Sequence, residues 1–238
     1  YLRPNWWHVG AEAPHLALKA QGEYLRFAQG HSMLGLDMDS LIGHWGTQSP
    51  LYYLIARLCV RPEMAVEEVV AEYCAAYGSA APQIRQYIAY WEDYAGRCKY
   101  AIRASGREVE EPDGLYEKIC IEQGFSLGPL GTSHRILPFL FQDEVIAPAD
   151  ALLDAADAAL AQDEVTARDR VQFLRDGLRH LRAKRDYIAA RFAETGKDEA
   201  LIRKRWNALL DLRRELTPSH VVWGEALTAQ ELQRSAAP

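Results

Sequence analysis

The chain has 238 residues, 49% of them hydrophobic, and a formal net charge of −6. A chain of this length and composition can bury a sizeable core in one large domain or two small ones, which argues against a disordered polypeptide. Basic residues are outnumbered and form no run longer than three, so the sequence shows no electrostatic footprint for nucleic acid or an anionic membrane surface. The best apolar run, residues 51–60, contains Arg57 and falls short of the roughly 20 residues of a membrane-spanning helix, so we expect neither partner.

The first sixty residues show an order of elements that differs from the rest of the chain. Residues 1–7 have the composition of a short buried strand, residues 14–29 have the apolar spacing of a helix, and residues 33–38 form a second apolar run. A strand, a helix and a strand within about forty residues fit a parallel crossover unit. The chain opens directly in strand-like sequence without an initiator Met, so we expect it to be the later part of a longer protein.

The next helix is expected to start at Ser49 and Pro50, which suit the N-cap and first helical positions, and to run to Val60. From Pro62 onward the apolar periodicity is helical almost to the end. The sequence therefore predicts a mainly α protein in two parts. Residues 1–62 would be the last two β/α units of a (β/α)8-type barrel, and residues 63–238 an α-helical domain.

Helical spacing defines the elements of this second part. The expected helices cover residues 66–77, closed by Gly78, then a longer helix capped by Ser79, a helix over 148–161, the longest helix, and a final one over 198–216. Residues 106–140 are rich in Gly and Pro, and we expect loops and one short helix there.

The longest helix is expected to follow a capping box of Thr166 and Asp169. Its apolar residues from Val171 to Phe192 form a heptad-like seam interrupted only by Arg185, so it should pack lengthwise on other helices. We interpret the charged run over residues 179–185 as the solvated face of this helix, and the tail beyond Gln230 as frayed.

The four cysteines lie far apart, without the CxxC or His-rich spacing of a zinc site, so neither metal nor cofactor is expected. Three fall on apolar faces of predicted helices, which favours free thiols packed as small hydrophobes over disulfides. The sequence leaves Cys120 undecided. His180 and His220 are isolated and are most simply structural.

Candidate binding residues gather at the ends of the two predicted strands. Working residues of a β/α barrel stand at the carboxy ends of its strands, where the loops converge on one mouth. Sugar recognition needs polar partners for hydroxyls together with aromatic planes for the apolar faces of pyranose rings. The candidate substrate-binding residues are Asn5, Trp6, Trp7, Asp37, Asp39, His44 and Trp45.

Asp37 and Asp39 are the only candidates for acid or base catalysis at these strand ends. Their period-two spacing would place both on one side of an extended strand, and two carboxylates divide acid and base work only at suitable separations. The alternative is that one caps the following loop while the other binds substrate hydroxyls or an Arg. The catalytic residues therefore stay unassigned, and His44 is as readily explained as a loop hydrogen bonder.

Three stretches resemble the end of an uncharacterised bacterial family, a domain of unknown function grouped with barrel glycoside hydrolases. They are YLRPNWW, SMLGLDMDSLIGHWGTQSPLYYLIARL and EEVVAEYCAAYGSAAPQIRQYIAYWE, and the later ALLDAADAALA and RVQFLRDGLRHL resemble that family's helical end. More distantly, LYYLIARLCVRPEMAVEEVVAEY is similar to the carboxy-terminal part of α-glucuronidases, which follow their barrel with a helical domain. The chain departs from the pattern at residues 60–62, Val-Arg-Pro, and at Ala65, where a capping side chain is usual.

The resemblance implies a carbohydrate substrate, including sugars with a uronic acid, and a helical part that supports the barrel or forms a homodimer. It implies that the catalytic carboxylates come from earlier strands, so this chain alone is not expected to turn over substrate. Two alternatives remain open. One is a carbohydrate-binding or scaffold protein that kept the barrel without the chemistry, and the other is a helical oligomerisation module built on the seam from Val171 to Phe192.

Overall fold

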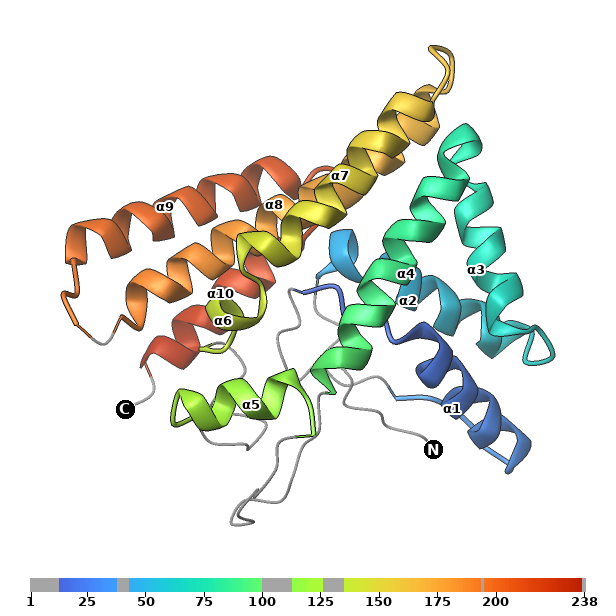
Figure 1. Ribbon diagram of the computed structural model, residues 1–238, viewed down its shortest axis with the longest axis horizontal. Helices are drawn as coiled ribbons and strands as arrows, with labels where there is room; N and C mark the ends of the chain where they lie inside the picture. The colour runs from blue at the N-terminus through green and yellow to red at the C-terminus, as the bar shows by residue number, and fades with distance from the viewer. Residues whose placement is uncertain (1–12, 38–42, 100–112, 126–134, 194, 237–238) are drawn as a thin grey trace.

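The computed structural model describes residues 13–37, 43–99, 113–125, 135–193 and 195–236, and α-helices dominate them (Figure 1). The prediction of a mainly α protein is confirmed for this part of the chain. These residues include no strand, because Leu36 alone has β pairing, as an isolated bridge. The first expected strand, residues 1–7, lies outside the described residues. The second, residues 33–38, is not formed over its described part, residues 33–37, which is irregular apart from that bridge. The two β/α units therefore remain a prediction.

The helices of the first half follow the apolar periodicity of the sequence. In chain order they are α1 (Leu18–Gly30), α2 (Trp45–Val60), α3 (Val66–Ala75), the 3-10 turn η1 (Gly78–Ala80) and α4 (Ala81–Cys98). The helices of the second half are α5 (Leu115–Glu122), α6 (Leu137–Leu140), α7 (Asp143–Ala159), α8 (Val165–Arg191), α9 (Glu199–Leu216) and α10 (Gly224–Ala236).

The predicted starts of two helices, α2 and α7, are wrong. Each was expected to begin at or next to a proline, and each in fact begins several residues earlier, so that the proline lies inside the helix. Helix α2 begins at Trp45, so Pro50 stands inside it and the Ser49 hydroxyl is hydrogen-bonded to the Tyr73 hydroxyl at 2.9 Å rather than capping the helix. Helix α7 begins at Asp143, five residues before Pro148. A proline this near the amino end removes only one helical hydrogen bond, so packing of the preceding residues can compensate.

The caps at Ser79 and at Thr166 are also wrong. Helix α8 starts at Val165, and the Glu164 carboxylate accepts the backbone N–H groups of Ser79 and Ala161, both at 2.9 Å. That one side chain ties η1 to the turn between α7 and α8. At α3 the Glu68 carboxylate accepts the Ala65 N–H at 2.9 Å, which supplies the half of a capping box that does not need an N-cap side chain.

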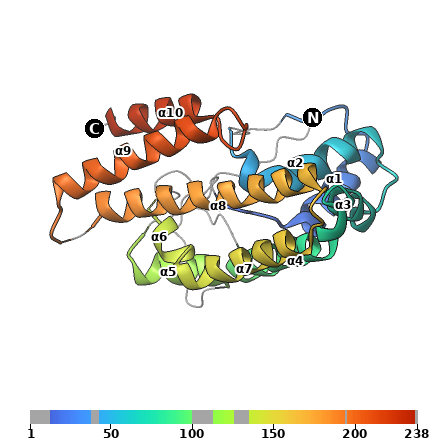
Figure 2. The ribbon, with the colours of Figure 1, turned by 90° about the horizontal axis from the view of Figure 1, so that it is seen from above.

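The helices stack in layers that place α8 at the centre. Figure 2 shows α8 and α2 between α9 and α10 on one side and α7 and α4 on the other. Helix α8 packs on α2, α6, α7 and α9, so its apolar seam is covered within the chain. The predicted lengthwise packing of this helix is confirmed. The tail is not frayed at Gln230, because α10 continues to Ala236 and packs on α9.

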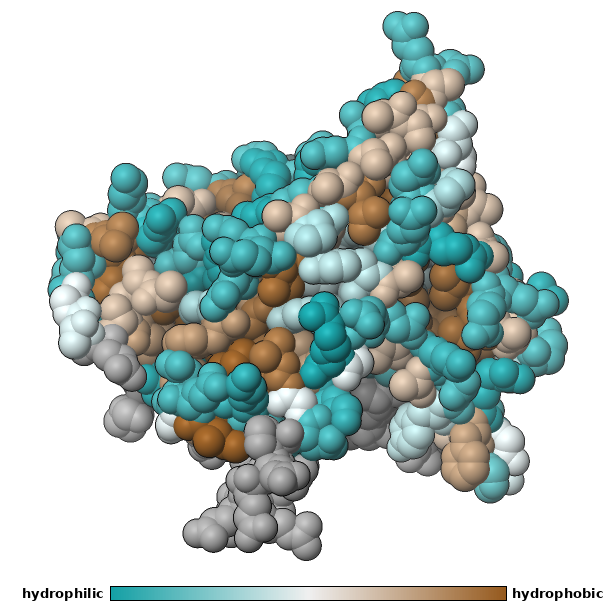
Figure 3. All heavy atoms as spheres, viewed as in Figure 1, coloured by the Kyte–Doolittle hydropathy of each residue, from teal (hydrophilic) through white to brown (hydrophobic). Residues whose placement is uncertain are grey.

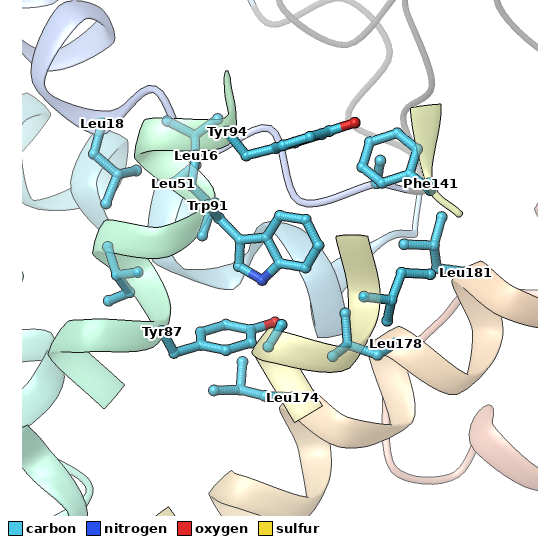
Figure 4. Packing of buried hydrophobic residues seen from close by; sticks show 14 of the residues in the cluster. Leu16, Leu18, Leu51, Tyr87, Trp91, Tyr94, Phe141, Leu174, Leu178 and Leu181 are labelled. Atoms are coloured by element: carbon cyan, nitrogen blue, oxygen red, sulfur yellow. The ribbon is translucent and has the colours of Figure 1, made fainter. Parts of the chain in front are cut away.

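The core centres on Trp91 of α4, which is fully buried (Figure 4). Its ring lies edge-on to Tyr87 and Tyr94, with centroids 6.3 Å and 6.0 Å away, and tilted against Phe141 at 6.2 Å. The Tyr94 hydroxyl donates a hydrogen bond to the Leu140 carbonyl, which fixes α4 to α6. The buried leucines of α2 and α8 belong to the same cluster. Residues on both sides of the predicted domain boundary at residue 62 therefore share one core.

All four cysteines are free thiols. Cys74, Cys98 and Cys120 are buried, and Cys59, expected on an apolar face, is exposed. Burial raises the pKa of the Cys74 and Cys120 thiols, so both stay protonated near neutral pH.

Candidate functional site

The amino end of α2 is held by backbone contacts to the segment before α10. The Gly46 N–H donates to the Val221 carbonyl at 2.9 Å, and the Trp223 N–H donates to the Gly43 carbonyl at 2.9 Å. Gly43 has a φ of +61°, and a Cβ atom there would lie 2.5 Å from the Trp223 Cβ. Only glycine fits this position, since both the dihedral angle and the space exclude a side chain.

A second glycine contact presses α2 against α8. A Cβ atom on Gly177 would lie 2.5 Å from the Gly46 carbonyl carbon, and one on Gly46 would lie 2.8 Å from the Gly177 Cα. The two backbones therefore touch where the helices cross. This contact fixes the position of Trp45, the first residue of α2.

Trp45 presents a half-exposed indole at this fixed point. The residue is 49% exposed, and its ring meets the Tyr52 ring edge-on, with centroids 4.6 Å apart and planes at 73°. Burial raises the pKa of the Tyr52 hydroxyl, which keeps it protonated. The indole is thus supported from behind by a neutral aromatic ring about two turns along the helix.

Trp223 is a second exposed indole, 58% exposed, on the segment hydrogen-bonded to Gly43. Trp223 is not among the predicted site residues, because it lies far along the sequence from the ends of the two predicted strands. The available signal was a tryptophan directly before a glycine, between two helical patterns. Trp45 and Trp223 thus belong to two segments that the fold ties together.

His44, unlike its neighbour Trp45, points into the protein. It is 4% exposed, and its ring lies 6.2 Å from that of His180. The structure therefore places His44 behind the surface formed by the indole.

A buried charged network lies next to this histidine pair. The Arg213 Nε donates to the His180 Nε2 at 3.2 Å, and the guanidinium binds both carboxylate oxygens of Glu231 at 2.8 and 2.9 Å. Lys184 also pairs with Glu231 and is 1% exposed. Because His180 accepts from Arg213, its ring carries a lone pair on Nε2 and is neutral in this arrangement.

This network overturns the interpretation of residues 179–185 as a wholly solvated face. His180 and Lys184 are buried, and the Arg185 side chain, 13% exposed, donates to the Phe141 carbonyl and pairs with Asp143. Buried cations need compensating partners, which are supplied by residues far along the chain. A pattern of local charges could not reveal those partners.

Of the remaining predicted site residues, only Asp37 is described, and it is exposed. Asn5, Trp6, Trp7 and Asp39 lie outside the described residues. At the start of α2 the structure thus buries His44 and leaves its neighbour Trp45 half-exposed.

Among the residues that the structure describes, no group of three His, Cys, Asp or Glu side chains is arranged to hold a metal ion. No helix in those same ranges is both long enough and apolar enough to cross a bilayer. Comparisons with protein-family models, with curated proteins and with solved structures each found no match to the chain.

Proposed function

We propose that the chain is the carboxy-terminal part of a carbohydrate-active protein of the glycoside hydrolase type. In this proposal the segments around Asn5, Asp37 and Trp45 contribute to sugar binding, and the helices from α3 onward support the preceding barrel units. The resemblance of the quoted stretches to barrel glycoside hydrolases supports it. The chemistry would depend on carboxylates from outside this chain.

The observation that carries the proposal is the fixed, half-exposed Trp45 ring. An indole face binds the C–H face of a pyranose, and it does so most tightly when its orientation is set before binding. The glycine contacts at Gly46 and Gly177 and the edge-on Tyr52 ring supply that fixed orientation. Trp223 adds a second exposed indole on the adjoining segment.

The oligomerisation module receives no comparable support. Val171, Leu174, Leu178 and Leu181 of the seam are each at most 1% exposed, because α2, α6, α7 and α9 cover them. The seam is therefore an internal surface of the chain as far as Ile188, and its last residue, Phe192, is exposed. A homodimer through the helical part would have to use other residues.

The test is carbohydrate binding by the parent protein, with the upstream coding sequence restored. Trp45→Ala should weaken binding on a glycan array and in titrations with glucuronic-acid oligosaccharides by about tenfold, as expected for one lost stacking ring in a desolvated contact. The matched control is Phe27→Ala, which removes an aromatic ring that is 63% exposed on α1.

Asp37→Ala and Asp39→Ala test the polar partners in the same assay. If Trp45→Ala and both aspartate variants bind and hydrolyse glycans as the unmutated parent does, the proposed site is wrong. If the unmutated parent binds no carbohydrate at all, the proposed class is wrong.

A further inference from the structure

A pocket of about 260 Å³ opens between α8, α9 and α10, at the end of the molecule where α9 begins. Figure 3 shows apolar residues among hydrophilic ones at that end. The Tyr187 and Trp206 rings stand together in its lining, with centroids 4.9 Å apart and planes tilted by 42°. The full lining is Tyr187, Arg191, Glu199, Ile202, Arg203, Trp206 and Leu232.

The α9 side of the pocket is one face of that helix. Glu199, Ile202, Arg203 and Trp206 are spaced at three and four residues, so they point to the same side. Arg203 is exposed, and no hydrogen bond or ion pair joins it to another residue of the described ranges. Its guanidinium therefore stands at the pocket with its donors directed to solvent or ligand.

The α8 side holds a second guanidinium in place. The Arg191 Nη1 donates to the Tyr187 hydroxyl at 2.7 Å, and the Arg191 guanidinium carbon lies 5.4 Å from the centre of the Phe192 ring. These contacts set the position of its positive charge. With two guanidinium groups and one carboxylate, Glu199, the lining favours an anion.

The rest of the lining determines which kind of group, a sugar or an apolar ring, can carry the anionic group of the ligand. Ile202, Trp206 and Leu232 are apolar, and the Tyr187 hydroxyl is already engaged by Arg191. The charged groups of the lining are two guanidinium groups, which only donate hydrogen bonds, and one carboxylate, Glu199. Most hydroxyl protons of a sugar would therefore find no acceptor there, and an unpaired hydroxyl in such a contact is costly. A flat apolar ring loses no such hydrogen bonds.

We infer that this pocket binds a small carboxylate borne on an aromatic ring. The ring lies against Trp206 and Leu232, and the carboxylate faces Arg203, whose planar fork matches its two oxygens. Glu199 repels the carboxylate and so orients it toward the arginines. The site is separate from Trp45, because Tyr187 lies ten residues beyond the Gly177 contact, about 15 Å along α8.

Titration calorimetry of the 238-residue chain with benzoate and 3-phenylpropanoate tests the inference. A ligand of about ten heavy atoms is expected to bind with a Kd on the order of 1 mM. Benzamide, which lacks the charge, and glucuronate, which lacks the aromatic ring, should each bind at least about tenfold more weakly.

Three exposed substitutions sharpen the test without touching the core. Arg203→Gln should weaken benzoate binding about tenfold. The matched control, Lys204→Gln, removes a positive charge at the next position, outside the lining, and should leave the Kd unchanged. Glu199→Gln should tighten binding a few-fold, because it removes a like charge.

The inference is overturned if neither ring acid shows saturable binding up to about 10 mM. It is also overturned if Arg203→Gln and Lys204→Gln change the Kd equally, or if glucuronate or benzamide binds as tightly as benzoate. Sugar binding at Trp45 is unaffected by any of these results.

Discussion

The close approach of α2 and α8 depends on the absence of a side chain at Gly46 and Gly177. The hydrogen atom that serves as the side chain of Gly177 is the largest group that fits against the Gly46 carbonyl. A methyl group there would separate the two helices and displace the first turn of α2. The orientation of the Trp45 indole therefore depends on a residue that no ligand touches.

Gly177→Ala is accordingly expected to lower the free energy of unfolding by about 2 kcal/mol, the usual cost of forcing a methyl group into a close-packed contact. Thermal and urea unfolding monitored by circular dichroism measure the change. Gly96→Ala is the matched control, since a Cβ atom there meets nothing within 4 Å.

The control should gain about 0.5–1 kcal/mol, because alanine is the better helix former. Equal stability of the two variants would show that the Gly46–Gly177 contact is not as close as described.

At the scale of helices, the apolar periodicity predicted most elements and placed their ends poorly. The helices over 66–77 and 198–216 are confirmed within a few residues at each end, since their stripes repeat at three and four residues. The starts of α2 and α7 were wrong because Pro50 and Pro148 suggest a first helical turn. Tertiary packing instead extends both helices toward the amino terminus, so that they begin before the proline.

The candidate site was predicted only in part for a related reason. His44 and Trp45 were singled out from local composition, and at the start of α2 the structure exposes Trp45 and buries His44. The contacts of Trp223 with Gly43, and of Arg213 with His180, join positions distant in sequence. Spacing within a helix carries no information about such contacts.

Helix α10 is attached to α8 and α9 through the buried carboxylate of Glu231 and through the buried Leu227. Glu231→Gln should lower the free energy of unfolding by about 3 kcal/mol, because it leaves Lys184 and Arg213 buried without their shared carboxylate. Urea unfolding followed by circular dichroism measures the loss.

Glu215→Gln is the comparison for this prediction, since Glu215 pairs with Arg179 at the surface and its side chain is 58% exposed. That variant should lose less than about 1 kcal/mol. A loss of the same size in both would mean that the buried network contributes no more than a surface ion pair.

For the whole molecule, the predicted boundary at residue 62 meets a continuous core. Leu51, Leu54 and Leu58 of α2 are packed in the same cluster as Leu174 and Leu178 of α8. A fragment of residues 63–238 would expose the α8 face that α2 covers. Its expected behaviour is a broad, non-cooperative thermal transition with reduced helicity by circular dichroism.

The 238-residue chain is the reference for that measurement, under identical buffer and concentration. A fragment that unfolds cooperatively within a few degrees of the full chain would contradict the expectation. It would support a separable helical domain that begins after residue 62.

The buried carboxylate of α10 also sets an order of events during synthesis. Lys184 is made 47 residues before Glu231, and Arg213 is made 18 residues before it. At about 5–20 residues per second, the two cations emerge roughly 2–9 s and 1–4 s ahead of their common partner. Until then both remain hydrated, so α8 and α9 reach their final packing only after residue 231 has joined the nascent chain.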